Sequence, residues 1–162
     1  FAFSGPGRRR MTLALALVLA ASLAGAEELH SYALVQDDAS LRIKGKTVYL
    51  DGIYLPPTER QCLSVMRPVR CGGRAVLALE FRIQGFVHCF VRTVNEDGSR
   101  TATCYVDRSH FDEGEDLSAY LISKGWAVAL PDAPFEYQAL ERIAREHDAG
   151  VWGFPADVIR RP

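Results

Sequence analysis

Four carboxylates and one guanidinium along this chain are of the types that together can hydrolyse a phosphodiester. The acids are Asp37, Asp38, Asp51 and Glu59, and the cation is Arg100. Carboxylate oxygens suit a calcium ion, and a positioned carboxylate can take a proton from water. A guanidinium can stabilise the charge that develops on the phosphoryl oxygens. This chemistry requires at least two of the carboxylates to converge within reach of one metal ion.

The four cysteines, Cys62, Cys71, Cys89 and Cys104, offer either disulfide bonds or a metal site. An even number of cysteines in an oxidising compartment predicts two disulfides. Of the three possible pairings, we expect Cys62–Cys71, which closes one loop, and Cys89–Cys104, which joins two neighbouring strands. A zinc site is the alternative, disfavoured because the chain has no CxxC pair and its four histidines are scattered. His88, beside Cys89, is expected to face the opposite side of a strand.

The first 26 residues have the pattern of a secretory signal peptide. Three arginines at 8–10 precede an uncharged apolar run from Thr12 to Ala24, and small residues follow. We therefore expect cleavage after Ala26 and a periplasmic or secreted location. The apolar run is too short to span a bilayer comfortably, so we expect no stable membrane anchor. The remainder, residues 27–162, is long enough for one domain with its own core.

Charge limits the partners of the mature chain. Residues 1–26 contain three arginines and no acids, so removing them from the 19 basic and 20 acidic residues of the sequence leaves 16 and 20, a net charge of −4. An acidic domain binds phosphate backbones poorly unless it carries a local basic patch. Nucleic acid is therefore a disfavoured partner, and the sequence points to no other.

Apolar periodicity predicts the elements that must position these side chains. Strands are expected at 29–36, 39–43, 46–50, 86–94 and 100–107, and helices at 74–83, 117–124 and about 134–148. Lys44-Gly45 and Asn95 to Gly98 are turn signals, Asp116 is suited to cap a helix, and Gly125 to end it. The expected buried residues are Ala75, Leu77, Ala78, Leu79 and Phe81 on the first helix, and Tyr137, Leu140 and either Ile143 or Ala144 on the last.

Five short strands with a helix after the third are the element order of an OB-fold barrel, which closes a sheet and removes its exposed edges. We therefore predict an α+β, mainly β, five-stranded barrel with three helices. The segment Ile53 to Pro57 is expected to be a loop after the third strand. The segment Pro56 to Gly73 is expected to be irregular and held by the Cys62–Cys71 bridge.

Four segments together resemble the staphylococcal-nuclease-like (thermonuclease) family, in its exported bacterial branch. They are VYLDGIYLPP with the following Gln61-Cys62, the run from Cys71-Gly72 through Ala75 to Leu79, DGSRTATC at 97–104, and the stretch from Asp116-Leu117 to Gly150-Val151-Trp152. The four have the family's order and spacing and cover nearly all of the mature chain. The resemblance implies one barrel domain of this family over residues 27–162.

The resemblance also implies where a catalytic centre would lie. Members that hydrolyse nucleic acid hold one calcium ion with carboxylates, activate a water with a glutamate and contact the phosphate with two arginines. At those positions this chain has Tyr49 and Ser99 for the arginines, Tyr54 and Ala39 for calcium aspartates, and Pro57 for the glutamate. Asp37, at the first position of the upstream calcium turn, agrees with the family.

Two neighbouring residues are candidates to compensate for these substitutions. Glu59 lies two residues beyond the glutamate position, and Arg100 lies one residue beyond an arginine position. On a strand, an offset of one residue turns a side chain to the opposite face, so Arg100 would need a bulge to reach the cleft. Tyrosine does not replace the fixed fork of donors on a guanidinium. Efficient calcium-dependent nuclease activity is therefore not expected.

Two hypotheses follow. The first is an exported binding or interaction module with a degenerate active site and no cofactor, whose former cleft is lined by Asp37, Tyr49, Tyr54 and Arg100. The tyrosines would stack on bases or a sugar, with plain packing as the alternative. The second is a weak or repurposed calcium-dependent nuclease acting on DNA or RNA through Glu59 and Arg100, with Asp37 as a metal ligand. Exposure of both tyrosines beside Arg100 favours the first, and convergence of carboxylates favours the second.

Overall fold

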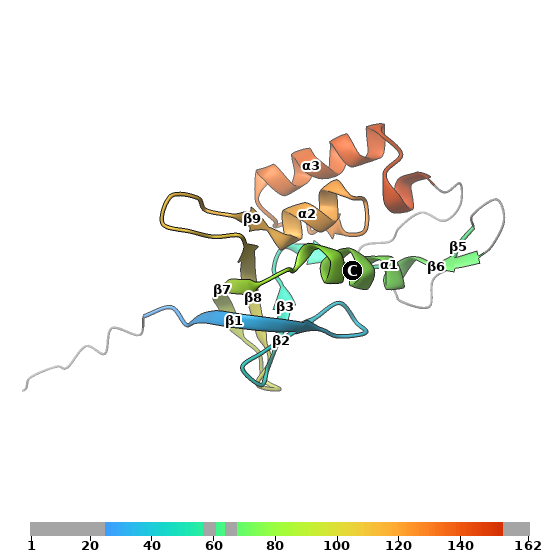
Figure 1. Cartoon of the computed structure of the whole chain (residues 1–162). Helices are drawn as coiled ribbons and strands as arrows, with labels where there is room; N and C mark the ends of the chain where they lie inside the picture. Colours follow the sequence, from blue (N-terminus) through green and yellow to red (C-terminus); the bar gives the residue numbers. More distant parts are fainter. Residues whose placement is uncertain (1–24, 57–60, 64–67, 154–162) are drawn as a thin grey trace, which may run out of the picture.

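The computed structural model describes residues 25–56, 61–63 and 68–153, without the side chains of 61–63 and 68–72. The predicted signal peptide lies almost entirely outside the described residues, as does Glu59. The described chain folds into a closed five-stranded barrel of mixed strands with three helices (Figure 1). This confirms the predicted α+β, mainly β, OB-fold-like architecture.

The barrel is one curved sheet whose two ends meet. Its strands are β1 (Glu28–Val35), β2 (Leu41–Ile43), β3 (Lys46–Leu50), β7 (Phe86–Val94) and β8 (Arg100–Val106). They run in the order β3-β2-β1-β7-β8 with antiparallel neighbours, and β3 then pairs with β8 in parallel. A two-residue strand, β9 (Glu115–Asp116), continues the sheet beyond β8. Closure pairs the two edges that an open sheet would leave exposed.

Alternation along the strands builds the barrel core. Leu41, Ile43 and Val48 are fully buried, and so are Val87 on β7 and Ala102 on β8. Successive side chains on a strand face opposite sides, so each buried residue is followed by one that faces outward. The strands therefore carry a second, outward set of side chains available for other roles.

Both predicted hairpin turns are present. Lys44 and Gly45 join β2 to β3, and both have positive φ, 49° and 76°. At the other turn, the N–H of Asn95 donates to the carbonyl of Ser99 at 2.8 Å, joining β7 to β8. These turns set the pairing register of the strands they connect, which decides which side chains face the core.

The segment from Ile53 to Pro57 is not simply a loop. Ile53–Tyr54 forms strand β4, which pairs with β10 (Val128–Ala129) from the far end of the chain. A two-residue strand has no periodicity of its own, so its pairing is decided by the partner segment. The prediction of a loop here was wrong for these two residues.

The segment expected to be irregular between Pro56 and Gly73 contains a short hairpin. Strands β5 (Gln61–Leu63) and β6 (Pro68–Arg70) pair antiparallel within it. Helix α1 (Cys71–Arg82) follows directly, three residues before its predicted start. The predicted Cys62–Cys71 bridge depends on side chains outside the described residues.

The buried face of α1 is narrower than predicted. Ala75 and Leu79 are buried, whereas Leu77 and Phe81 are 45% and 78% exposed. Residues four apart lie on one face of a helix, but residues two apart lie about 200° apart around its axis. Placing Leu77 and Phe81 on the core face was therefore wrong.

Helix α2 (Leu117–Ser123) packs between the barrel and α3 (Phe135–Glu146), and a short 3-10 helix, η1 (Gly150–Gly153), follows (Figure 1). The predicted cap is present: the Asp116 carboxylate accepts from the N–H groups of Ser118 and Ala119 at 2.8 and 3.4 Å. Gly125 follows the end of α2 with a φ of 74°. Within the described residues, none of the helices has the length and apolar character needed to cross a membrane.

Helix α3 buries Tyr137, Glu141 and Ala144. Of the two alternatives for its third core position, Ala144 is buried and Ile143 is 51% exposed. Leu140, also predicted to be buried, is partly covered and packs against the core. The buried carboxylate of Glu141 was missed, because its partners lie on another segment that the helical pattern does not reveal.

The predicted Cys89–Cys104 disulfide is present and joins residues directly opposite each other on β7 and β8. Both cysteines are fully buried, and His88 faces the other side of β7, as expected. The bond closes a loop with a sequence separation of 15 residues.

Replacing both Cys89 and Cys104 by alanine is expected to lower the free energy of unfolding by about 3 kcal/mol, because the unfolded chain regains the entropy that the closed loop removes. The measurement is urea denaturation of the oxidised variant against the oxidised parent. Using the variant rather than a reductant leaves Cys62 and Cys71 untouched. An unchanged urea midpoint would contradict the assigned role of this disulfide.

Candidate ligand cleft

Tyr49 is one of the four residues that the sequence predicted to line a ligand cleft. It faces outward from β3 and is 40% exposed. It lines a cleft of about 560 Å³ together with Ser99, the end of β7 and the β7–β8 turn. The lining residues of these two segments are Thr93, Val94, Asn95, Glu96 and Asp97. The cleft thus lies between β3 and the hairpin that joins β7 to β8.

Hydrogen bonds within the turn make one wall of this cleft rigid. The Asn95 side-chain amide donates to Ser99 Oγ at 2.9 Å and to Thr101 Oγ1 at 3.3 Å. The Asp97 carboxylate accepts from Ser99 Oγ at 2.6 Å and from the Ser99 N–H at 2.9 Å. These bonds from Ser99 hold the pKa of the Asp97 carboxyl below its usual range. The wall therefore carries a fixed negative charge.

Arg100 is not among the residues that line this cleft. Its Nε donates to the Glu27 carboxylate at 3.2 Å, and its Nη1 donates to the carbonyl of Gly98. The other oxygen of Glu27 accepts from Lys46 Nζ, so one carboxylate links the start of β1 to β3 and β8. The hydrogen bond from Lys46 lowers the pKa of Glu27, Arg100 adds to this, and desolvation opposes it.

The other predicted cleft residues lie apart from Tyr49. Tyr54 is on β4, opposite Val128, and does not line the cleft. Asp37 is exposed in the turn between β1 and β2. In the same turn the Asp38 carboxylate accepts from Ser40, from its Oγ at 2.6 Å and its N–H at 2.9 Å. Of the predicted set, the structure therefore places Tyr49 in this cleft, and Glu59 falls outside the described residues.

The described carboxylates do not fit the calcium site that the family resemblance implies. Within residues 25–56 and 68–153, no group of three or more His, Cys, Asp or Glu side chains is arranged to hold a metal ion. The Asp38 carboxylate is engaged with Ser40. A calcium ion needs several oxygen ligands at one point, so no hydrolytic step is derived from this arrangement.

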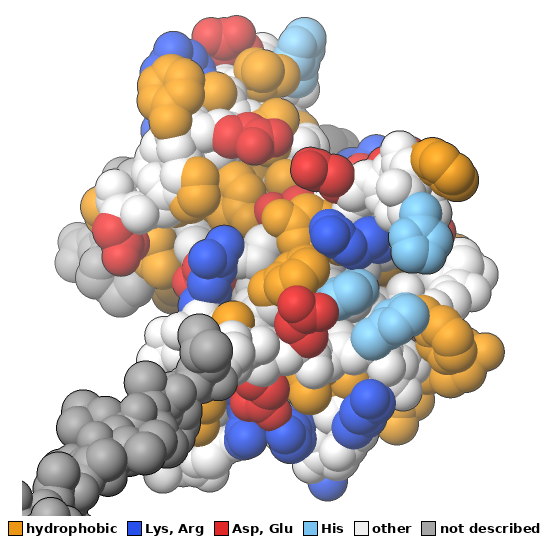
Figure 2. Space-filling model, turned by 90° about the vertical axis from the view of Figure 1, so that its left-hand side faces the viewer, with side chains coloured by type: hydrophobic (Ala, Val, Ile, Leu, Met, Phe, Trp, Pro, Cys, Tyr) orange, Lys and Arg blue, Asp and Glu red, His pale blue; other side chains and the backbone are white. Residues whose placement is uncertain are grey.

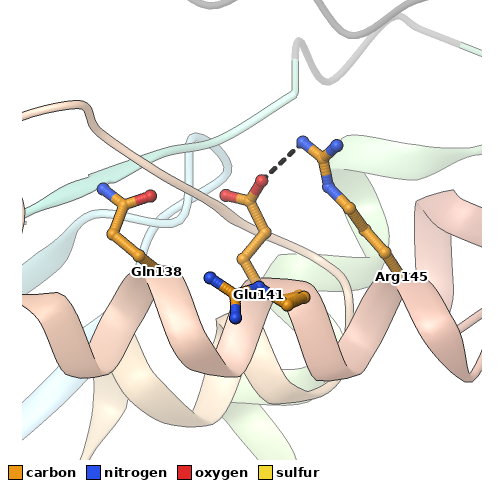
Figure 3. Close-up of a pocket in the computed structure, with 4 residues that line it drawn as sticks. Gln138, Glu141 and Arg145 are labelled. Atoms are coloured by element: carbon orange, nitrogen blue, oxygen red, sulfur yellow. Dashed lines mark hydrogen bonds and ion pairs between the residues drawn. The ribbon is translucent and has the colours of Figure 1, made fainter.

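Two carboxylates, one buried and one half-buried, hold the helical layer to the chain segments beside it. Glu141 accepts from the N–H of Ala129 on β10 at 2.7 Å and from Arg145 at 2.5 Å. Figure 3 shows Gln138, Glu141 and Arg145 on one face of α3, with the Glu141–Arg145 ion pair marked. Gln138 donates to the carbonyl of Leu130 at 2.6 Å. These contacts hold α3 to the segment that includes β10, so we assign Gln138, Glu141 and Arg145 a structural role.

The second carboxylate is the α2 cap, Asp116, which is half-buried. Burial raises its pKa, against the opposing hydrogen bonds from Tyr137, Ser118 and Ala119. Burial and the Asp116 carboxylate likewise raise the pKa of the Tyr137 hydroxyl, which donates to Asp116. The two groups therefore form a hydrogen-bonded pair between α2 and α3.

Two comparisons of the sequence with known proteins identified no relative. No family model matches the sequence, and a search of curated proteins likewise finds no match.

Proposed function

We propose that this chain is an exported barrel of the nuclease-homologue type that acts as a binding module and lacks efficient nuclease activity. The proposed export is based on the signal-peptide pattern of the first 26 residues, which predicts cleavage after Ala26 and a periplasmic or secreted location. The barrel has the architecture that the resemblance to the staphylococcal-nuclease-like family implies. The disulfide Cys89–Cys104 suits an oxidising compartment.

The observation that carries this proposal is the position of Arg100. Its guanidinium bonds to Glu27 and Gly98 rather than facing the Tyr49 cleft. The family's two arginine positions hold Tyr49 and Ser99, neither of which brings a positive charge. Loss of a preorganised cation at a phosphoryl group costs orders of magnitude in rate. The cleft is therefore suited to binding and not to phosphoryl-transfer chemistry.

The cleft also favours one kind of partner over another. Glu96 and Asp97 supply carboxylates, Tyr49 and Val94 supply exposed apolar surface, and its lining includes no Lys or Arg. Negative charge repels a phosphate backbone, and the mature chain is acidic as a whole. A partner that brings positive charge and hydrogen-bond donors, such as a lysine-rich protein segment, is complementary to this lining.

The test has a catalytic arm. The mature, oxidised protein is incubated with single-stranded DNA and RNA, with and without calcium, beside an Arg100→Ala variant that reveals contaminating nuclease. We expect no cleavage above that variant. Calcium-dependent cleavage that Arg100→Ala abolishes would overturn the proposal and favour the weak calcium-dependent nuclease, with Arg100 and Glu59 in a rebuilt active site.

The binding arm uses a labelled lysine-rich peptide and a labelled single-stranded DNA of equal length. We expect fluorescence polarisation to show weak binding of the peptide and none of the DNA. Tyr49→Ala and Asp97→Asn should each weaken peptide binding several-fold. Tyr120→Ala is the matched control, because Tyr120 lies on α2 and is not part of the cleft lining. Stronger binding of the DNA than of the peptide would contradict the assigned partner class.

A further inference from the structure

Aromatic side chains form a continuous group on the outer face of β1, β7 and β8. His30 lies directly opposite His88, and His88 lies directly opposite Tyr105. The rings of His30 and His88 stack with centroids 4.9 Å apart, and those of His88 and Phe90 stack at 4.7 Å. Stacked rings cover one another's faces, so the imidazole edges with their nitrogen atoms are the parts that a ligand can reach.

A pocket opens at one end of this stack. It has a volume of about 440 Å³ and is lined by His30, His88, Arg108, Ser109 and His110, which we call the histidine pocket. Figure 2 shows histidine side chains gathered beside basic ones on this face of the molecule. The strands supply two imidazoles, and the loop after β8 supplies the third, with the guanidinium and the hydroxyl. All five side chains can donate a hydrogen bond.

Arg108 is held by aromatic rings. Its guanidinium carbon lies 4.9 Å from the centroid of Phe90 and 5.7 Å from that of Tyr105. The structure gives Arg108 no ion pair with any carboxylate in the described part of the chain. A guanidinium stacked on rings keeps its N–H groups free in its own plane, which is the geometry that binds oxyanions through two parallel bonds.

Acidic groups near the pocket lie outside its lining, although one of them contacts a lining residue. Glu28 contacts His88 Nε2 at 3.1 Å and so occupies one nitrogen of that imidazole. The Asp112 carboxylate accepts from the N–H of Gly114 at 2.8 Å. Glu113 and Asp116 act electrostatically on Tyr105. None of these four acids is among the residues that line the pocket. The lining therefore has the character of an anion site on an otherwise acidic protein.

An exposed apolar surface adjoins the histidine pocket. Phe86 contacts the His30 ring edge-on at a centroid distance of 5.2 Å, and Tyr32 packs against Phe86 at 4.4 Å. Phe86 is 53% exposed and Tyr32 70% exposed. A ligand whose anion sits in the pocket would thus have an aromatic surface beside it.

We propose that the histidine pocket binds the phosphate group of a small ester whose apolar part rests on Phe86 and Tyr32. Arg108 supplies the permanent positive charge, and His30, His110 and Ser109 supply further donors around the oxyanion. Because these donors come from β1 and from the loop after β8, they can approach the several oxygens of a tetrahedral oxyanion from different sides. The inference is independent of the proposed function, because the histidine pocket shares no lining residue with the Tyr49 cleft.

The test is calorimetric titration of the mature, oxidised protein with phenyl phosphate, inorganic phosphate and inorganic sulfate. We expect phenyl phosphate to bind one to one and more tightly than inorganic phosphate, which in turn binds more tightly than sulfate. Arg108→Ala should weaken the binding of phenyl phosphate about tenfold, because a charge-assisted hydrogen bond is lost. Arg108→Lys, which keeps the charge and loses the planar fork, should give a smaller loss. Phe86→Ala should remove the advantage of the phenyl ester while leaving inorganic phosphate unchanged.

The matched control is Arg42→Ala, since Arg42 is an exposed arginine on β2, away from the pocket lining. It should leave all three affinities unchanged. Equal losses from Arg42→Ala and Arg108→Ala would show general charge attraction and overturn the site. Absence of phosphate binding would overturn it too, and sulfate binding as tightly as phosphate would overturn the assignment to phosphate. Equal binding of phenyl phosphate and inorganic phosphate would remove the role given to Phe86.

Discussion

Gly125→Ala is expected to lower the free energy of unfolding by about 3 kcal/mol or more. Gly125 follows α2 with a φ of 74°, which costs an L-residue about 1–2 kcal/mol. A Cβ atom on this residue would also overlap the carbonyl oxygen of Ala149, which is backbone and cannot rotate away. Overpacking of this kind adds about 1–3 kcal/mol. The N–H of Val151 donates to Gly125 O at 2.9 Å, so relief of the clash would disturb the α2–η1 contact as well.

Gly98→Ala is the matched control for this prediction. Gly98 has a φ of 82°, but a Cβ atom there would meet no other atom within 4 Å. Its substitution should cost about 1–2 kcal/mol, the backbone contribution alone. Urea denaturation of both variants separates the cost of the positive φ from the cost of the overlap with Ala149 O. Equal destabilisation by the two substitutions would mean that the backbone of Ala149 does not constrain Gly125.

Asp116→Ala is expected to lower the free energy of unfolding by about 2–4 kcal/mol. The substitution removes the N-cap of α2, which contributes about 1 kcal/mol. It also leaves the hydroxyl of Tyr137 without its acceptor, and Tyr137 is only 5% exposed. A buried hydroxyl without a partner costs about 1–3 kcal/mol. The second effect depends on Tyr137, so the two residues should be coupled.

A double-mutant cycle measures that coupling. Tyr137→Phe alone removes the hydroxyl, and Asp116→Ala in the Tyr137→Phe background should then cost about 1 kcal/mol, the cap alone. Chemical denaturation gives the free energy of unfolding of the parent, the two single variants and the double variant. Additive losses from the two single variants would show that the Tyr137 hydroxyl is satisfied in another way.

The same carboxylate predicts a pH dependence of stability. Burial raises the pKa of Asp116 in the folded protein, so the folded state holds this proton more tightly than the unfolded chain does. The stability that this bound proton contributes is therefore fully present below the ordinary carboxyl pKa. It is lost as the pH rises through the raised pKa of Asp116 in the folded protein. Asp116→Asn keeps a capping side chain and removes the titration, so its stability relative to the parent should improve over that pH range. A constant difference between the two proteins would contradict the raised pKa.

Local patterns were sufficient for much of the fold. The alternation in Lys46–Leu50, the turn chemistry of Lys44-Gly45 and the cap at Asp116 each act over a few residues, so each could be predicted directly. The pairing of Cys89 with Cys104 also follows from strands joined by a short turn. The mistakes fell on α1, whose apolar residues exceed what one face can bury, and on short strands such as β4 that pair with distant segments.

The candidate sites depended much more on tertiary contacts. Glu27 and Arg100 are 73 positions apart in the chain, yet their ion pair decides that the guanidinium is not part of the Tyr49 cleft. His30 and His88 looked scattered, and the pairing register of β1 with β7 brings their rings together.

The sequence by itself determined the strands, the turns and the helix cap, because these are properties of neighbouring residues. Only the tertiary structure decided which polar side chains meet. Closure of the barrel and the pairing registers set those distances, and a shift of one residue in register would turn each of these side chains to the other face.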